Sequence, residues 1–184
     1  MKTKFGIIPS VVIVSALLVG PTEAYDKPGA FYIGGMVGNA SYDYEDVGNS
    51  TTGQFYVGYR DPDSHFGIEI AVIDLGEADI DSLPGWSLNP AGTNVSVVYH
   101  NISDIGQLGY LFKLGLYSID TDLVINGVTV ATDSGSGLSL GGGLVYPVNR
   151  HLSFRAELQG FVGVKDFADN SSVFSGNVGV DVQF

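Results

Sequence analysis

The sequence predicts an all-β fold, an eight-stranded antiparallel up-and-down transmembrane β-barrel that follows a cleaved signal peptide. Residues 174–184 alternate between apolar and small or polar side chains and end on the aromatic Phe184. Side chains alternate across a strand, so this segment has one apolar face. Seven earlier segments alternate in a similar way, and the chain begins with an export signal. Together these features are typical of a barrel whose strands face lipid.

The first 24 residues have the pattern of a secretory signal peptide. Two lysines precede the apolar residues 7–20, and small residues precede a predicted cleavage site after Ala24. The apolar run is short for a membrane-spanning helix. We therefore expect residues 1–24 to be removed and residues 25–184 to form a single barrel domain.

Eight segments have the periodicity of strands. They cover residues 30–41, 53–60, 65–75, 93–100, 107–118, 137–146, 151–162 and 172–184. The first is expected to place Phe31 and Val37 outside. Odd positions are apolar in the second and fourth segments, as at Val57, and even positions in the other later segments, as at Phe112.

The opposite face of each strand carries mixed and often charged side chains: Gln54, Arg60, Glu69, Asn94, Ser96, Lys113, Ser139, Ser153, Arg155, Glu157, Gln159, Asn177, Asp181 and Gln183. A soluble sandwich or calyx would turn its apolar face inward, and alternation alone does not distinguish the two arrangements. The signal peptide and Phe184 favour an apolar exterior in contact with lipid.

Long and short connections alternate along the chain. The long ones are residues 42–52, 76–92, 119–136 and 163–171, and the short ones are 61–64, 101–106 and 147–150. Short periplasmic turns and long external loops are typical of bacterial outer-membrane barrels. We therefore expect both mature termini in the periplasm. Trp86, in the second long loop, is expected to anchor that loop on the barrel rim.

Six stretches carry a resemblance to a known family. They are residues 31–38, 66–76, 111–115, 141–146, 152–157 and 180–184. In this order they resemble the outer membrane protein A-like family of eight-stranded barrels, over the whole predicted mature region and as the barrel domain only. The resemblance implies a Gram-negative outer membrane. Val180, Val182 and Phe184 are predicted to form the C-terminal signal that the barrel-assembly machinery reads.

Four charged residues share the predicted inward face: Glu69, Lys113, Arg155 and Glu157. They match the inward acid, base and Arg-x-Glu pair of the resembled family, whose further acid on strand six falls on Val145 here. The lumen of an eight-stranded barrel is narrow and filled by side chains, so charges there must pair. We predict a structural ion-pair network; the alternative is a narrow, switchable ion path.

The composition is acidic, with 8 Lys and Arg against 20 Asp and Glu, for a net charge of −12. The absence of basic clusters excludes nucleic acid as a partner. Acids gather in the long loops, which predicts a solvated rim; divalent-cation binding and docking of a basic partner are alternatives. The acids of residues 77–81 lack the Gly and closing Glu of a calcium loop. No metal ligands or cofactors are predicted.

The predicted function is that of a monomeric, integral outer-membrane protein in contact with lipid and lipopolysaccharide. Its role is structural or surface-interactive: envelope integrity, adhesion or recognition of an extracellular protein or surface ligand through four acidic loops. The alternatives are a low-conductance porin-like channel, a lipid A-modifying enzyme and a secreted soluble ligand-binding barrel. His151-Leu-Ser153 has the His-x-Ser form of lipid A deacylases, but it follows a predicted periplasmic turn. We therefore predict no catalytic residues.

Overall fold

The computed structural model describes residues 31–43, 48–61, 64–80, 82–102, 104–164 and 171–184. The predicted signal peptide lies outside this part of the chain. The described residues contain no helix long and apolar enough to cross a membrane. Their strands are β1 (Phe31–Tyr42), β2 (Ser50–Arg60), β3 (Phe66–Asp74), β4 (Ala78–Asp79), β5 (Trp86–Asn101), β6 (Gly109–Ile125), β7 (Val128–Pro147), β8 (Leu152–Val164) and β9 (Ser171–Gln183).

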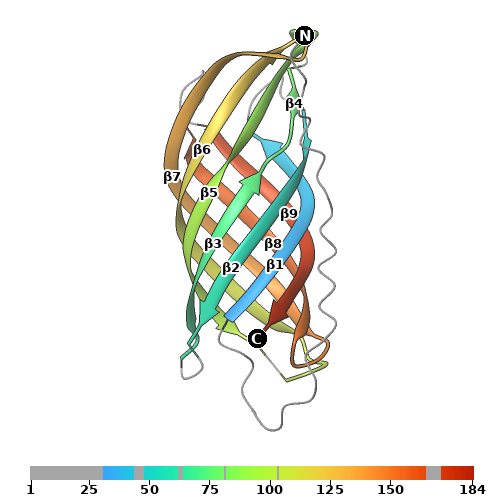
Figure 1. Cartoon of the computed structure of the whole chain (residues 1–184), viewed down its shortest axis with the longest axis vertical. Helices are drawn as coiled ribbons and strands as arrows, with labels where there is room; N and C mark the ends of the chain where they lie inside the picture. The colour runs from blue at the N-terminus through green and yellow to red at the C-terminus, as the bar shows by residue number, and fades with distance from the viewer. Residues whose placement is uncertain (1–30, 44–47, 62–63, 81, 103, 165–170) are drawn as a thin grey trace.

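Eight of these strands close into a ring in the order β1-β2-β3-β5-β6-β7-β8-β9, and β9 pairs with β1. Every neighbouring pair is antiparallel (Figure 1). The short β4 pairs only with β5 and lies outside the ring. The predicted eight-stranded up-and-down barrel is therefore confirmed. We call the end where Phe31 and Gln183 lie the terminus end, and the opposite end the loop end.

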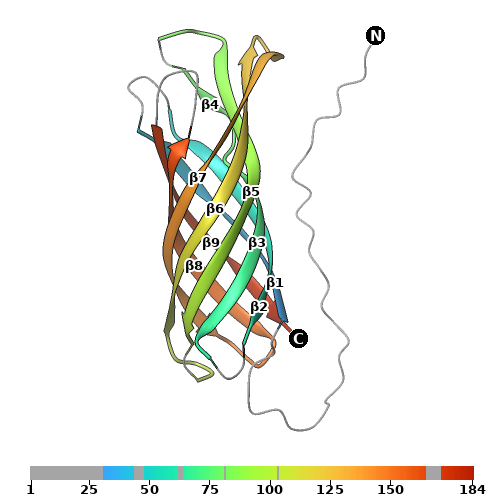
Figure 2. The same ribbon diagram turned by 90° about the vertical axis from the view of Figure 1, so that its left-hand side faces the viewer.

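The prediction was wrong at two of the long loops. Strand β5 begins at Trp86, so residues 86–92 of the loop expected over residues 76–92 are strand, and Trp86 pairs with Ile125 instead of lying in mid-loop. Strands β6 and β7 together occupy nearly all of residues 119–136. We call the hairpin of residues 119–137 the β6–β7 arm, and Figure 2 shows it rising at the loop end.

The turn of this arm explains the error. Asn126 and Gly127 have φ values of 50° and 76°. Two consecutive residues with positive φ define the tight hairpin turn that matches the twist of the flanking strands, and Asn-Gly is its preferred sequence. This dipeptide, between residues 123–125 and 128–130 of strand-forming type, was the available signal for a hairpin in the segment predicted as a loop.

The predicted division between the two faces is confirmed. Outward apolar side chains are exposed, for example Phe112 at 58% and Leu158 at 72%. The predicted inward polar and charged residues are all buried: Gln54, Arg60, Glu69, Asn94, Ser96, Lys113, Ser139, Ser153, Arg155, Glu157, Gln159, Asn177, Asp181 and Gln183. A fold with a dry exterior and a charged interior is suited to hydrocarbon, since water would favour the reverse.

Aromatic side chains form a band outside the terminus end. The rings of Phe31 and Tyr59 lie 4.9 Å apart, and Tyr99 contacts both Phe66 and Tyr110 at 5.5 and 6.4 Å between centroids. Such rings suit the boundary between hydrocarbon and head groups, because they combine an apolar body with polar edges.

The lumen contains apolar clusters on both sides of its polar centre. Toward the loop end, the rings of Tyr117 and Phe161 pack edge to face with centroids 5.4 Å apart, among buried Ile73, Ile119 and Val173. Toward the terminus end, Val98, Leu111 and Val145 form a second cluster. The charged residues of the lumen lie between these two clusters.

Candidate functional site: a charged cluster in the lumen

The backbone register makes room for the charged side chains. Each of the four predicted residues lies directly opposite a glycine on a neighbouring strand: Glu69 opposite Gly58, Lys113 opposite Gly141, Arg155 opposite Gly179 and Glu157 opposite Gly143. A glycine occupies no space inside the barrel, so a long side chain beside it can extend across the lumen.

The structure brings Glu69, Lys113, Arg155 and Glu157 into contact. Lys113 Nζ lies 2.5 Å from Glu69 Oε1 and 2.9 Å from Glu157 Oε1. Arg155 Nη1 lies 2.9 Å from Glu69 Oε2, and Arg155 Nη2 lies 2.6 Å from Glu157 Oε2. Each cation thus bridges both carboxylates. The four side chains are almost completely buried, so the pairs replace the water that these charges have lost.

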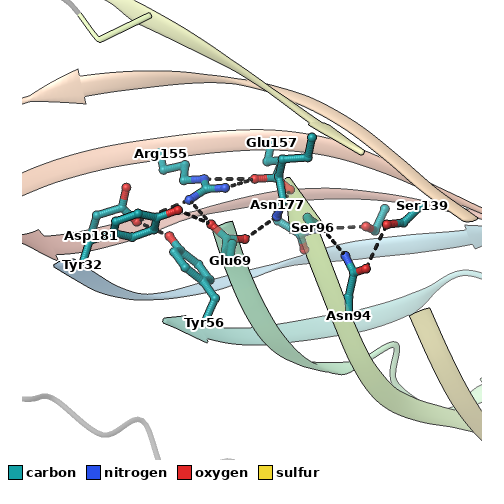
Figure 3. Close-up of polar contacts among 12 residues, drawn as sticks. Tyr32, Tyr56, Glu69, Asn94, Ser96, Ser139, Arg155, Glu157, Asn177 and Asp181 are labelled. Atoms are coloured by element: carbon teal, nitrogen blue, oxygen red, sulfur yellow. Dashed lines mark hydrogen bonds and ion pairs between the residues drawn. The ribbon is translucent and has the colours of Figure 1, made fainter. Parts of the chain in front are cut away.

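Two tyrosines and an aspartate extend this cluster (Figure 3). Tyr32 donates a hydrogen bond of 3.1 Å to Glu69 Oε2, and Tyr56 donates one to Asp181 Oδ1. The guanidinium of Arg155 lies 4.6 Å from the centroid of the Tyr56 ring, within the range of a cation–π contact. Asp181 Oδ1 is 3.9 Å from Arg155 Nη1.

The buried charges balance among the described residues. Three acids, Glu69, Glu157 and Asp181, face three bases, Arg60, Lys113 and Arg155. Arg60 lies toward the terminus end, where Nη2 donates a hydrogen bond of 3.2 Å to Gln183 Oε1. A neutral total is important in a narrow lumen, because an unmatched buried charge is strongly destabilising.

A layer of uncharged polar side chains separates the charges from the apolar cluster at the loop end. Ser139 Oγ donates to Asn94 Oδ1 at 2.9 Å, and Asn94 Nδ2 donates to Ser96 Oγ at 3.1 Å (Figure 3). The amide of Gln159 is buried in this layer and has no hydrogen-bond partner among the described protein groups. This residue therefore differs from the charged ones beside it, which are all paired.

The sequence did not single out all of this cluster. Asp181 and Arg60 were placed on the inward face but were not assigned to an ion pair, and Tyr32 and Tyr56 were missed. Alternation within β1 and β2 places both tyrosines inward, and that was the available signal. Val145, where the resembled family has an acid, is buried in the terminus-end apolar cluster. A third buried acid is supplied by Asp181 on β9.

The predicted C-terminal signal lies on the lipid-facing side of the barrel. Val180 and Phe184 are exposed, and Val182 is half-buried. The backbone N–H of Phe184 donates a hydrogen bond to the carbonyl of Phe31 at 2.9 Å. Phe184 therefore extends the pairing between β9 and β1.

The His-x-Ser motif does not form a nucleophile–base pair. Ser153 is fully buried in the lumen and accepts a hydrogen bond of 3.0 Å from Gln183 Nε2. The His151 ring is exposed, and its Nδ1 lies 3.0 Å from the Gln183 carbonyl. Hydroxyl nucleophiles need the base within hydrogen-bond reach, and here both groups contact Gln183.

The acids of the loop end are only partly described. Asp120, Asp122 and Asp133 lie on the β6–β7 arm; Asp43, Asp74, Glu77 and Asp79 lie in or beside other strands. The predicted loop acids Glu45, Asp46, Asp81, Asp166 and Asp169, with Lys165, lie outside the described residues. Within the described part, no group of three or more His, Asp or Glu is arranged to hold a metal ion.

A closed antiparallel ring with an apolar exterior, an aromatic band and a charge-balanced interior defines a transmembrane β-barrel. The chain belongs to the outer membrane protein beta-barrel domain family, whose match covers residues 10–184. It is therefore an outer-membrane protein of a Gram-negative cell envelope, as the sequence predicted.

Solved structures share this fold at low sequence identity. Neisserial surface protein A is 15% identical with a TM-score of 0.69, over 84% of this chain and 97% of that chain. The N-terminal barrel of Pseudomonas aeruginosa OprF is 16% identical with a TM-score of 0.62, over 85% and 98%. Ail, the attachment invasion locus protein of Yersinia pestis, is 13% identical with a TM-score of 0.56, over 87% and 100%. No curated protein matches the sequence.

Proposed function

We propose that this protein is a closed, structural outer-membrane barrel that supports envelope integrity and presents its loop end to extracellular partners. The filled lumen carries this proposal. The ion pairs between Lys113, Arg155 and the two glutamates join strands across the barrel, and apolar clusters cover them on both sides. Side chains that fill a barrel in this way make it a packed core.

An ion that crossed the lumen would meet two obstacles. It would pass between apolar side chains such as Tyr117 and Phe161, where an unpaired charge is unfavourable. It would then separate the ion pairs, and removing one partner of a buried pair costs ~3–5 kcal/mol. These costs favour a structural role for the charges over the alternative of a low-conductance channel.

Planar-bilayer recording tests this choice directly. The purified, folded protein is expected to leave the bilayer current at its baseline, with incorporation shown by the shift in gel mobility between unheated and heated barrel. Steady, unitary current steps from folded protein would contradict the closed lumen and support the channel.

The proposed orientation places both mature termini in the periplasm and the loop end outside the cell. The chain has no cysteine, so single-cysteine variants report on each end. Val128→Cys lies on the exposed part of the β6–β7 arm, and Arg150→Cys on the exposed turn between β7 and β8. In intact cells, a membrane-impermeant maleimide is expected to label the first variant and not the second. The opposite labelling pattern would reverse the orientation.

The proposed partners follow from the surface chemistry. The lipid-facing side chains contact outer-membrane lipid and lipopolysaccharide, and Val180, Val182 and Phe184 supply the signal for the barrel-assembly machinery. The protein acts as a monomer. Ail has been solved in complex with the heparin analogue sucrose octasulfate, a polyanion. This chain carries a net charge of −12, which favours a basic extracellular partner over an anionic one.

The role in envelope integrity has a separate test. Cells that lack the protein are expected to become more sensitive to detergent and to regain resistance when the wild-type chain is restored. If the barrel conducts no ions and its loss leaves detergent resistance unchanged, its role would be limited to surface interactions.

A further inference from the structure

One edge of the β6–β7 arm has no strand beside it in the described part of the chain. Strand β7 pairs with β6 from Val128 onward. Its pairing with β8, on the other side, begins only at Leu138 and continues to Pro147. The backbone of residues 128–137 thus has a paired side and an open side. Figures 1 and 2 both show the arm extending past the loop-end limit of β8.

A bulge in β8 lies where its pairing with β7 stops. The pairing of β8 with β9 shifts between Val162 and Val164, and Gly163 between them has a φ of 86°. Bulges increase local twist and can end pairing on one side. Beyond Val162, β8 pairs with β9 at Ser171 and no longer with β7.

The unpaired side of β7 is clearest toward the tip of the arm. Strand β8 ends at Val164, and its pairing with β7 begins only at Leu138. Among the described residues, no strand therefore pairs with residues 128–132 on this side.

The open edge lacks lysine and proline, although a bulge between Leu123 and Val124 in the pairing with β6 leaves Val130 without an opposite residue. Proteins commonly block an exposed edge with lysine or proline, whereas residues 128–132 are Val-Thr-Val-Ala-Thr. Val128 and Val130 are 61% and 52% exposed. Strand residues of this kind favour pairing with a further strand.

Carboxylates lie beside the edge on the neighbouring strand. Asp122 Oδ1 accepts a hydrogen bond of 2.6 Å from Thr132 Oγ1, and Asp120 Oδ1 accepts one of 2.6 Å from Ser134 Oγ. Asp120 is exposed and Asp122 is half-buried. A strand added at the open side of β7 would have β7 between it and these acids, at about two strand spacings (~9–10 Å), so long basic side chains on that strand would be favoured.

We propose that residues 128–132 of β7 bind an extended, basic segment of an extracellular protein, which adds to the arm as a further strand. Main-chain hydrogen bonds to β7 supply the attachment, and the carboxylates of β6 attract the basic side chains from one strand further away. A second copy of this chain fits less well, because two acidic arms would repel each other. This inference rests on the proposed function only for the placement of the arm outside the cell.

Two peptide probes distinguish strand addition from charge attraction. The first is a ten-residue peptide of alternating lysine and valine; the second has the same side chains but carries an N-methyl group on every residue, which removes the N–H donors of both edges. Binding to the purified barrel in non-ionic detergent is measured by fluorescence anisotropy. The methylated probe is expected to bind at least about tenfold more weakly, since several main-chain hydrogen bonds are lost. Equal affinity would overturn the proposal.

An arm-shortened variant locates the binding. Ile119 pairs with Gly135, so residues 120–134 can be replaced by Asn-Gly, which closes a shorter hairpin in register. This change removes three aspartates. Its control is Asp61→Asn/Asp79→Asn/Asp104→Asn, which removes three exposed acids elsewhere. The shortened variant is expected to lose probe binding by at least about tenfold and the control to retain it.

Other outcomes count against the proposal. Unchanged binding of the probe to the shortened variant would show that the arm does not take part in the interaction. A dimer of the free protein in sedimentation, lost on shortening, would assign the edge to a second copy. If the shortened variant did not fold, the comparison of the two probes on wild-type protein would still decide. Because binding in detergent is independent of orientation, its failure is distinct from failure of the cysteine-labelling test.

Discussion

Arg155 contacts Glu69 across the full width of the barrel, with Nη1 2.9 Å from Oε2. Their strands, β8 and β3, are separated by three strands in either direction around the ring. No backbone hydrogen bond links such strands directly. The ion pair therefore joins opposite walls of the barrel, and Lys113 makes a second link from β6 to the same carboxylate.

Glu69→Ala is expected to lower the stability of the folded barrel. The change leaves Lys113 and Arg155 each without one of their carboxylate partners, and an uncompensated buried charge costs ~3–5 kcal/mol. Thermal unfolding in detergent, followed by circular dichroism and gel mobility, measures the effect.

Two control variants separate this effect from the general loss of a polar side chain. Asp79→Ala removes an exposed carboxylate, and Gln159→Leu removes a buried amide that has no protein partner. Neither is expected to lower the unfolding temperature as much as Glu69→Ala. Equal effects from all three variants would mean that the ion pairs do not stabilise the barrel.

Lys113 and Glu157 are expected to be energetically coupled. Lys113→Met leaves Glu157 with one cation, and Glu157→Gln leaves Lys113 with one anion. The double variant is expected to be more stable than the sum of the single effects predicts, by ~0.5–3 kcal/mol. Denaturant unfolding of all four proteins gives the coupling energy. Strict additivity would contradict a shared network.

Gly58 is expected to tolerate no side chain. A Cβ at this position would overlap the ring of Tyr32, which donates its hydroxyl to Glu69. Gly58→Ala should therefore destabilise the barrel by ~1–3 kcal/mol, the usual range for overpacking. Gly53→Ala on the same strand is the matched control, since a Cβ there meets nothing within 4 Å. Similar unfolding curves for the two variants would contradict the packing of Tyr32 against Gly58.

Gly127→Val is expected to loosen the β6–β7 arm without affecting the barrel. Placing a side chain on a residue with the observed φ of 76° raises the free energy of the turn by ~1–2 kcal/mol. Amide hydrogen exchange should become faster across residues 119–136, while the unfolding temperature of the barrel stays constant. Unchanged exchange would argue against the Asn126-Gly127 turn.

Phe184→Ala is expected to reduce the amount of protein assembled in the membrane. Residue 184 is exposed on the lipid side at the very end of β9, so its removal should affect recognition during insertion more than the stability of the folded barrel. Quantitative membrane fractionation measures assembly, and in vitro refolding of the same variant is the control. Wild-type levels in cells would contradict the proposed signal.

The alternation of side chains predicted the strands and their faces, but some contacts depended on register. In β3 and β6 the even and odd positions face opposite sides of the sheet, since Ile68 is exposed while Glu69 is buried, and Phe112 is exposed while Lys113 is buried. Such local patterns were sufficient to place each charge inside. They did not show that Asp181 approaches Arg155 or that Tyr56 packs on its guanidinium, because strands β2, β8 and β9 meet there only after the ring has closed.

The β6–β7 arm shows the limit of reasoning from composition. Residues 119–136 were predicted to form a loop, whereas the pairing of β6 with β7 continues to the Asn126-Gly127 turn. Threonine, serine and aspartate in a strand outside the membrane face water on both sides, so hydrophobic alternation fades although the strand persists.

By itself the sequence determined the barrel class, the strand number and which side chains face lipid, because these depend on a two-residue periodicity that is local to each strand. Only the tertiary structure decided which charged side chains form ion pairs, how the glycines opposite them leave space in the lumen, and where β7 stops pairing with β8. Those features depend on the stagger between strands, and stagger is fixed when the sheet closes on itself.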